Sequence, residues 1–328
     1  MKLFFLTLGI FVLFSGCSNK RYFEPKHSDF YFDTTAIDFG SYISSINSKG
    51  ATLENHHFID KVGGISDIKL PNGFEFLNNS KGTVFAASNN HKLLIVNSGK
   101  IITFKSNVIA VSQNKNMLAL LFENNSIGLY DLESKQFKLK KYYKHSFLND
   151  TRIAMPKFLN NMVLFPVLDG KIIVVDLKQY KAIKTITIDP ASEVKNIILL
   201  DIINDTMIAA TPNKIIALKD GTIFTKEFFI QDYNINKNFI YIATHDGRVL
   251  KLDFNLKIIK EHKFKFAKFQ ALAVGANDIY AIESQSYIVK ISKDFDHIKV
   301  YTFPFEEDEK IFVNKNKIYF ENKLLIVK

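Results

Sequence analysis

Seven β-hairpins recur along the chain between residue 83 and residue 327, and this repeat restricts the possible folds more than any other feature. Each hairpin has an apolar strand, a short turn rich in Asn, Asp, Gly or Ser, and a second apolar strand. The second strands begin at residues 93, 127, 172, 215, 249, 288 and 324, which are 34 to 45 residues apart. Turns such as Asp169-Gly170 and Asp246-Gly247 between β-branched runs are strong hairpin signals. A period near 40 with several short strands is typical of a β-propeller.

Further strand-like runs lie between the hairpins and supply the remaining strands of each blade. Residues 137–142 and 182–188 fit outer strands, whereas residues 108–111 and 269–274 fit inner strands. The sequence therefore predicts an all-β propeller of seven four-stranded blades. Eight blades remain an alternative if residues 30–59 build a blade of their own.

The last hairpin lacks an outer strand after residue 327, so we expect an N-terminal strand within residues 51–60 to close the ring.

The first seventeen residues have the pattern of a secretion signal that ends at a cysteine. Lys2 supplies a positive charge, and residues 3–14 form an apolar run that is too short to span a bilayer as a stable helix. Ser15-Gly16-Cys17 follows, and residues 13–17 resemble the bacterial lipobox, in which the cysteine is acylated after cleavage. We expect a signal peptide at residues 1–16, a lipidated N-terminus and tether at residues 17–45, and the propeller at residues 46–328.

Cys17 is the only cysteine in the chain, which excludes an intrachain disulfide and a cysteine-based metal site. Acyl chains on Cys17 would anchor the protein to a membrane. By resemblance to lipoproteins of bacteria with two membranes, Ser18 after the cysteine favours the outer membrane. We expect the propeller to face the periplasm.

The net charge of +10 comes almost entirely from lysine, because only Arg21, Arg152 and Arg248 of the 43 basic residues are arginines. Nucleic-acid readers rely on arginine for bidentate contacts, and no long lysine block is present, so we expect no nucleic-acid partner. A basic face could instead meet an anionic surface such as lipid headgroups.

A strand that ends in an Asp followed by Leu or Phe recurs at Val175-Asp176-Leu177, Tyr130-Asp131-Leu132 and Leu252-Asp253-Phe254. This pattern resembles the blades of quinoprotein-like propellers. Together with the lipobox-like segment, the chain resembles the propeller lipoprotein of the outer-membrane β-barrel assembly machinery. The resemblance implies a non-enzymatic scaffold that contacts the barrel-assembly complex. We expect the recurring aspartates to form hydrogen bonds with the backbone of their own turns rather than to act in catalysis.

No pattern indicates a cofactor, a metal site or a catalytic residue. Quinone-dependent propeller enzymes need a stacking Trp and commonly a vicinal Cys pair, and this chain has no Trp and a single Cys. His56 and His57 are adjacent, so on a strand they would point to opposite faces and could not bind one ion.

The leading interpretation is a scaffold anchored to the outer membrane that binds an envelope protein. Two alternatives remain: a surface adhesin or ligand-binding propeller, and a propeller hydrolase or lyase with a site in the central funnel. Carboxylates or histidines that converge on the channel would favour the enzyme, and an apolar rim would favour the scaffold.

Overall fold

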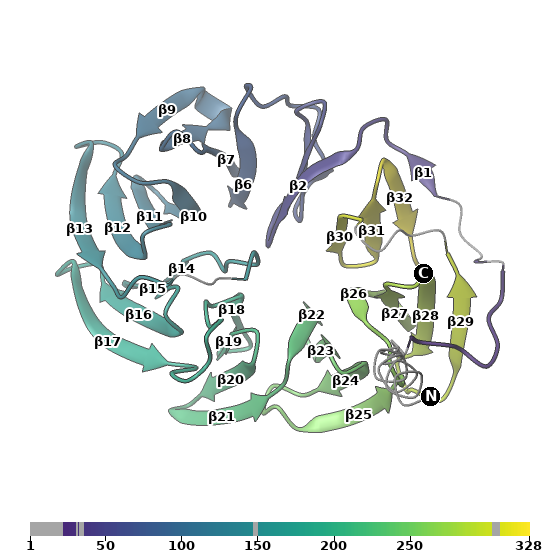
Figure 1. The fold of residues 1–328 in the computed structure, drawn as a ribbon. Coiled ribbons are helices and arrows are strands. Elements are labelled where there is room, and N and C mark those ends of the chain that lie inside the picture. Colours follow the sequence, from purple (N-terminus) through teal and green to yellow (C-terminus); the bar gives the residue numbers. More distant parts are fainter. Residues whose placement is uncertain (1–21, 31, 33–35, 147–149, 304–308) are drawn as a thin grey trace, which may run out of the picture.

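The computed structural model describes residues 22–328 except residues 31, 33–35, 147–149 and 304–308. Within these residues, eight four-stranded antiparallel sheets surround a central axis as the blades of a propeller (Figure 1). The prediction of an all-β propeller is therefore confirmed, and the blade count is eight rather than seven.

The first four blades contain sixteen strands and one short 3-10 helix. Their bounds are β2 (Ile43–Asn47), β3 (Gly50–Leu53), β4 (Phe58–Asp60) and β5 (Gly64–Ile65); β6 (Glu75–Ser80), β7 (Thr83–Ser88), β8 (Lys92–Ile95), η1 (Val96–Ser98) and β9 (Lys100–Thr103); β10 (Val108–Asn114), β11 (Met117–Phe122), β12 (Ser126–Asp131) and β13 (Gln136–Tyr142); β14 (Lys157–Leu159), β15 (Met162–Pro166), β16 (Lys171–Asp176) and β17 (Lys181–Thr187).

The last four blades contain the other sixteen strands. Their bounds are β18 (Leu199–Ile203), β19 (Thr206–Ala210), β20 (Lys214–Lys219) and β21 (Thr222–Glu227); β22 (Ile230–Ile235), β23 (Ile240–Thr244), β24 (Arg248–Leu252) and β25 (Ile258–Lys263); β26 (Phe269–Val274), β27 (Asp278–Glu283), β28 (Tyr287–Ser292) and β29 (Ile298–Thr302); β30 (Ile311–Asn314), β31 (Lys317–Phe320), β32 (Lys323–Ile326) and β1 (Ile37–Asp38).

An N-terminal strand closes the ring, as expected, but it is β1 and not a strand within residues 51–60. Ile37 pairs with Leu324, and Asp38 pairs with Lys323, so β1 is the outer strand of the eighth blade. Residues 51–60 instead form β3 and β4 of the first blade. The strands of the ring begin at Ile37, before the boundary expected at residue 46.

The second and third strands of each blade are buried on both faces because neighbouring blades cover both. This burial explains continuous apolar runs such as β11 and β19, in which nearly every side chain is buried. The outer strands alternate exposed and partly buried residues and carry many lysines, which discourages edge-to-edge pairing.

Phenylalanine supplies much of the large-residue packing between the blades. The fully buried phenylalanines are spread around the ring: Phe58, Phe85, Phe122, Phe165, Phe269 and Phe320. Aromatic side chains bury large apolar areas, so they fill these inter-blade layers in a chain that has no Trp.

Residues 22–30, named here the N-terminal strap, bind the outer side of the sixth and seventh blades before the chain reaches β1. The buried Phe23 ring packs edge-on against Phe264 and Tyr287, with centroid separations of 6.1 and 5.7 Å. The Asp29 backbone N–H donates to the Val300 carbonyl at 2.9 Å, and Thr302 N–H donates back to the Asp29 carbonyl at 3.0 Å. The strap thus adds one bridge to the edge of β29 and fixes where the chain leaves the ring.

No helix in the described part of the chain is long and apolar enough to cross a membrane.

Candidate functional site: the central channel

A segment of the third-to-fourth blade connection, residues 150–154, enters the centre of the ring. The Ile153 carbonyl accepts a hydrogen bond from the Ser48 hydroxyl, and Ser48 belongs to the turn after β2 in the first blade. The first and fourth blades are not neighbours in an eight-membered ring. The contact therefore requires the two segments to meet across the channel, and Figure 1 shows the chain before β14 reaching toward the end of β2. We call residues 150–154 the crossing segment.

Arg152 is the main anchor of the crossing segment. Its guanidinium donates to Asp150, to the Gln231 carbonyl at 2.6 Å and to the Ile230 carbonyl at 3.1 Å. Burial lowers the pKa of Arg152, but the hydrogen bonds and charge of Asp150 outweigh it and hold the pKa above its usual value. Arg152 therefore stays charged and links the crossing segment to the sixth blade.

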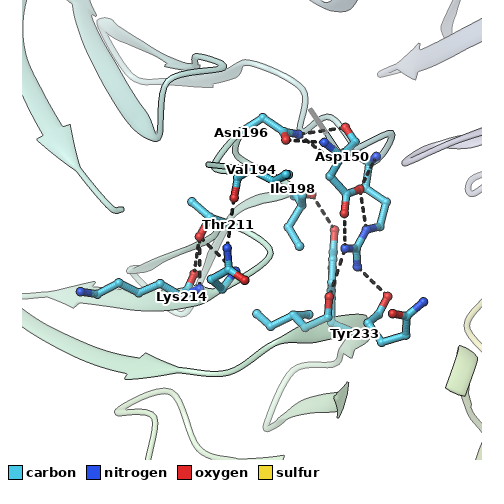
Figure 2. A network of polar contacts seen from close by, with 11 residues as sticks. Asp150, Val194, Asn196, Ile198, Thr211, Lys214 and Tyr233 are labelled. Carbon is cyan, nitrogen blue, oxygen red and sulfur yellow. Dashed lines mark hydrogen bonds and ion pairs between the residues drawn. The ribbon is translucent and has the colours of Figure 1, made fainter. Parts of the chain in front are cut away.

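Asn196 holds the other side of the crossing segment to the fifth blade. Its side chain accepts from Asp150 N–H at 2.7 Å and donates to the Asp150 carbonyl at 3.1 Å, as Figure 2 shows. Ala154 N–H adds a bond to the Ile197 carbonyl at 2.9 Å. These contacts fix the crossing segment from three blades at once.

A cavity of about 350 Å³ lies beside the crossing segment within the channel. Its walls come from the first, fifth, sixth, seventh and eighth blades. The charged side chains that line it are Lys49, Lys61, Arg152, Asp201, Asp232 and Lys315.

The two aspartates of the cavity already have partners. Asp201 forms an ion pair with Lys157 at 2.8 Å. Asp232 accepts a hydrogen bond from Leu272 N–H at 2.7 Å and so joins the sixth blade to the seventh. Burial raises the pKa of Asp232, against the opposing charge of Arg152.

Two lysines in the cavity have lowered pKa values. Burial lowers the pKa of Lys49 to about 8, and the neighbouring charge of Lys61 contributes to this shift. Burial also lowers the pKa of Lys61, although Asp232 and Asp201 oppose the change. Lys49 is half-buried, whereas Lys61 reaches solvent at the cavity mouth.

The turns between the first and second strands of the blades form the rim of this end of the channel. Lysine occupies five of them: Lys49, Lys81, Lys115, Lys237 and Lys315. The rim is therefore basic. An apolar rim, which would have favoured the scaffold, is not what these turns form. The cavity lining within the described residues contains two carboxylates and no histidine, and both carboxylates have partners. The lining of this cavity, as far as the described residues go, therefore does not show the converging carboxylates or histidines expected of an enzyme.

The recurring aspartates do what the sequence predicts. Asp131, Asp176 and Asp253 each accept a hydrogen bond from the backbone N–H two residues later, at 2.8 to 3.0 Å. His56 and His57 lie in and beside the turn between β3 and β4 rather than within a strand, and the His57 ring contacts the Ser66 carbonyl at 2.9 Å. Cys17 and the signal peptide at residues 1–16 lie outside the described residues.

Sequence reasoning did not identify the crossing segment or the cavity lysines. Arg152 carried a signal, because arginine is rare in this lysine-rich chain and Asp150 precedes it by two residues. The sequence around Lys49 and Lys61 gives no such signal, since these residues resemble the other lysines at turns.

The fold defines the protein as an eight-bladed β-propeller with a partly filled central channel. Solved structures with the same architecture include BamB from Moraxella catarrhalis, with a TM-score of 0.64 and 13% identity over 90% of this chain and 99% of that one. The C-terminal WD40 domain of Sif2 also gives a TM-score of 0.64, with 12% identity over 91% of this chain and 100% of that one. At such identities, the similarity establishes the shared fold.

Among curated proteins, the chain is similar to the plasminogen-binding protein PgbB of two Helicobacter pylori strains. The identity is 26% for strain J99 and 27% for strain 26695, in each case over 87% of this chain. The chain spans about three fifths of the length of these relatives, 62% and 61%. No protein-family model matches the chain.

Proposed function

We propose that the protein is a lipid-anchored propeller of the bacterial cell envelope that binds another protein and does not catalyse a reaction. The similarity to PgbB carries this proposal, because it extends over 87% of the chain and PgbB is named for binding a protein. The propeller fold shared with BamB is compatible with a binding role.

The outer strands provide surfaces for protein binding. Apart from β29, which the strap bridges, each is the free edge of its blade. Isoleucines on four of them are exposed by 40 to 54%: Ile101, Ile183, Ile223 and Ile259. A partner segment could pair with such an edge and cover its isoleucine. The neighbouring lysines would select for a partner with acidic residues.

Two partners are candidates, and they place the propeller on opposite sides of the outer membrane. The first is the barrel-assembly complex in the periplasm, supported by the BamB-like fold. The second is an extracellular protein such as plasminogen, supported by the PgbB similarity.

The strap would orient the ring on the membrane. Five peptide units separate Cys17 from Tyr22, so the acyl chains would lie within about 18 Å of Tyr22. The strap lies beside Lys263, Lys265 and Lys299. We propose that this side of the sixth and seventh blades faces the lipid headgroups, where lysines contribute about 1 kcal/mol each to binding an anionic leaflet.

Cys17→Ser is expected to release the protein from the membrane, because no acyl chain could then be attached. Detergent phase partitioning of cell extracts measures this: the wild-type protein should enter the detergent phase and the variant the aqueous phase. Asn19→Ser is the matched control and should behave as the wild type. A Cys17→Ser protein that still enters the detergent phase would contradict the lipid anchor.

Affinity purification from detergent-solubilised membranes, combined with protease treatment of intact cells, distinguishes the partners. Co-purification of the barrel-assembly complex with a protease-resistant propeller is the result expected for the periplasmic scaffold. Cleavage in intact cells with capture of plasminogen supports the second partner. A propeller that retains no protein in either assay would refute the binding role.

A further inference from the structure

Among the described residues that line the cavity beside the crossing segment, basic side chains outnumber carboxylates by four to two. Asp150 pairs with Arg152, and Asp201 pairs with Lys157. Within the described residues, no carboxylate lies within ion-pair distance of the Lys49, Lys61 or Lys315 ammonium groups. Among the described residues, Asp201 and the buried Asp232 act on Lys49 and Lys61 from a distance, and Asp232 also accepts a backbone hydrogen bond. The cavity therefore has an excess of positive charge.

The two central lysines are held together by hydrogen bonds between their turns. The Asn47 side chain accepts from Lys49 N–H at 2.7 Å and from Gly50 N–H at 3.0 Å. Lys61 N–H donates to the Lys49 carbonyl at 3.1 Å. The Asn314 side chain donates to the Lys61 carbonyl at 3.1 Å and joins this pair of turns to the eighth blade.

Gly50 fixes the position of the first turn further. A Cβ atom there would lie 2.1 Å from the Ile59 carbonyl oxygen and 2.5 Å from the Phe76 ring, so the backbone packs tightly at this point. Both lysines line the same cavity and lie on turns whose backbones are held in place. Such preorganisation lowers the entropy cost of binding a ligand.

We propose that this cavity binds a small organic anion that bears two or more carboxylates or a phosphate group, held between Lys49, Lys61 and Lys315. The inference goes beyond the proposed protein-binding function and does not depend on it. A volume of about 350 Å³ is at the lower end for small-molecule sites and suits a metabolite-sized ligand rather than a polymer. Lys81, Lys115 and Lys237 on the rim would attract an anion toward the entrance.

The pH dependence of binding follows from the groups that face Lys49. These are Lys61 from the turn after β4, Lys157 from β14 and Asp201 from β18. Burial and the charges of Lys61 and Lys157 lower the pKa of Lys49 to about 8, although Asp201 opposes this change. A bound anion favours the charged lysine. Raising the pH from 7 to 9 removes that charge, so the affinity for an anion should fall over this interval.

Isothermal titration calorimetry of the full chain at constant ionic strength tests the proposal, with citrate and pyrophosphate as probes. The double variant Lys49→Met, Lys61→Met should lose at least about tenfold in affinity for the probe that binds, because it loses two charge-assisted hydrogen bonds. The control Lys184→Met, Lys226→Met removes the same charge from exposed outer strands and should change the affinity by less than about twofold.

Two results would overturn the proposal: neither probe binds the wild-type protein, or both double variants lose affinity equally. If the Lys49→Met, Lys61→Met variant fails to fold, the proposal is tested instead by the pH dependence of citrate binding to the wild-type protein. Citrate can only gain negative charge between pH 7 and pH 9, so weaker binding at the higher pH reports the lysines. An unchanged citrate affinity would then count against the site.

Discussion

Arg152→Met should lower the free energy of unfolding by about 3 kcal/mol, because the substitution leaves several polar groups in the channel without partners. The Asp150 carboxylate would lose its ion pair, and the Ile230 and Gln231 carbonyls would lose the guanidinium that joins them to the crossing segment. Methionine retains most of the apolar stem, so the loss reports the charged group. Equilibrium denaturant unfolding measures the change.

Arg248→Met is the matched control for this experiment. Arg248 pairs with Asp246 and Glu261, whose side chains are 42% and 37% exposed, so solvent can replace the lost contacts. We expect a loss below about 1 kcal/mol at Arg248. Arg152→Lys should recover only part of the stability, because one ammonium cannot reach Asp150 and both carbonyls together. Equal losses at Arg152 and Arg248 would show that the crossing segment is not held by its arginine.

Gly247→Ala should destabilise the protein by about 3 kcal/mol or more, through backbone strain and a steric clash together. Gly247 has a φ of +81°, and a Cβ atom there would lie 2.3 Å from the Phe264 carbonyl oxygen and 3.0 Å from that of Ala267. Both atoms belong to the backbone that leads into the seventh blade. This connection is held to the turn because Phe264 N–H donates to the Gly247 carbonyl at 2.8 Å.

Gly221→Ala separates the strain from the clash. Gly221 also has a φ of +81°, but a Cβ atom there would meet no other atom within 4 Å. We expect a loss of about 1 kcal/mol there, which is the cost of the left-handed conformation alone. Thermal and denaturant unfolding of the two variants should therefore differ by about 2 kcal/mol. A smaller loss at Gly247 than at Gly221 would be incompatible with the close approach of the connection.

The sequence predicted the hairpins of seven blades because their middle strands are buried on both faces. Residues 117–122 form β11, and residues 278–283 form β27, as the apolar runs indicate. The first blade was predicted only as an alternative, within residues 30–59, because its strands are short and polar residues interrupt them. β5 has two residues, and β2 has the sequence ISSIN.

The closing strand was misplaced for a related reason. β1 has two residues, both exposed, so it has no apolar pattern to detect. Its position depends on the strap, which binds the outer side of the ring, and on its pairing with Leu324 and Lys323. Such pairing over nearly the whole chain length exists only once the ring has formed.

Local patterns in the sequence were enough to predict the repeating blade, the role of Asp131, Asp176 and Asp253 in their turns, and a lipid anchor at Cys17. These features depend on neighbouring residues, because hairpin turns, alternating burial and signal peptides are local patterns. In contrast, the position of Arg152 across the channel and the cavity that Lys49 and Lys61 share with Lys315 follow from the closed ring. The groups that meet there are separated by up to 266 residues in sequence, and closing the ring brings them to one axis.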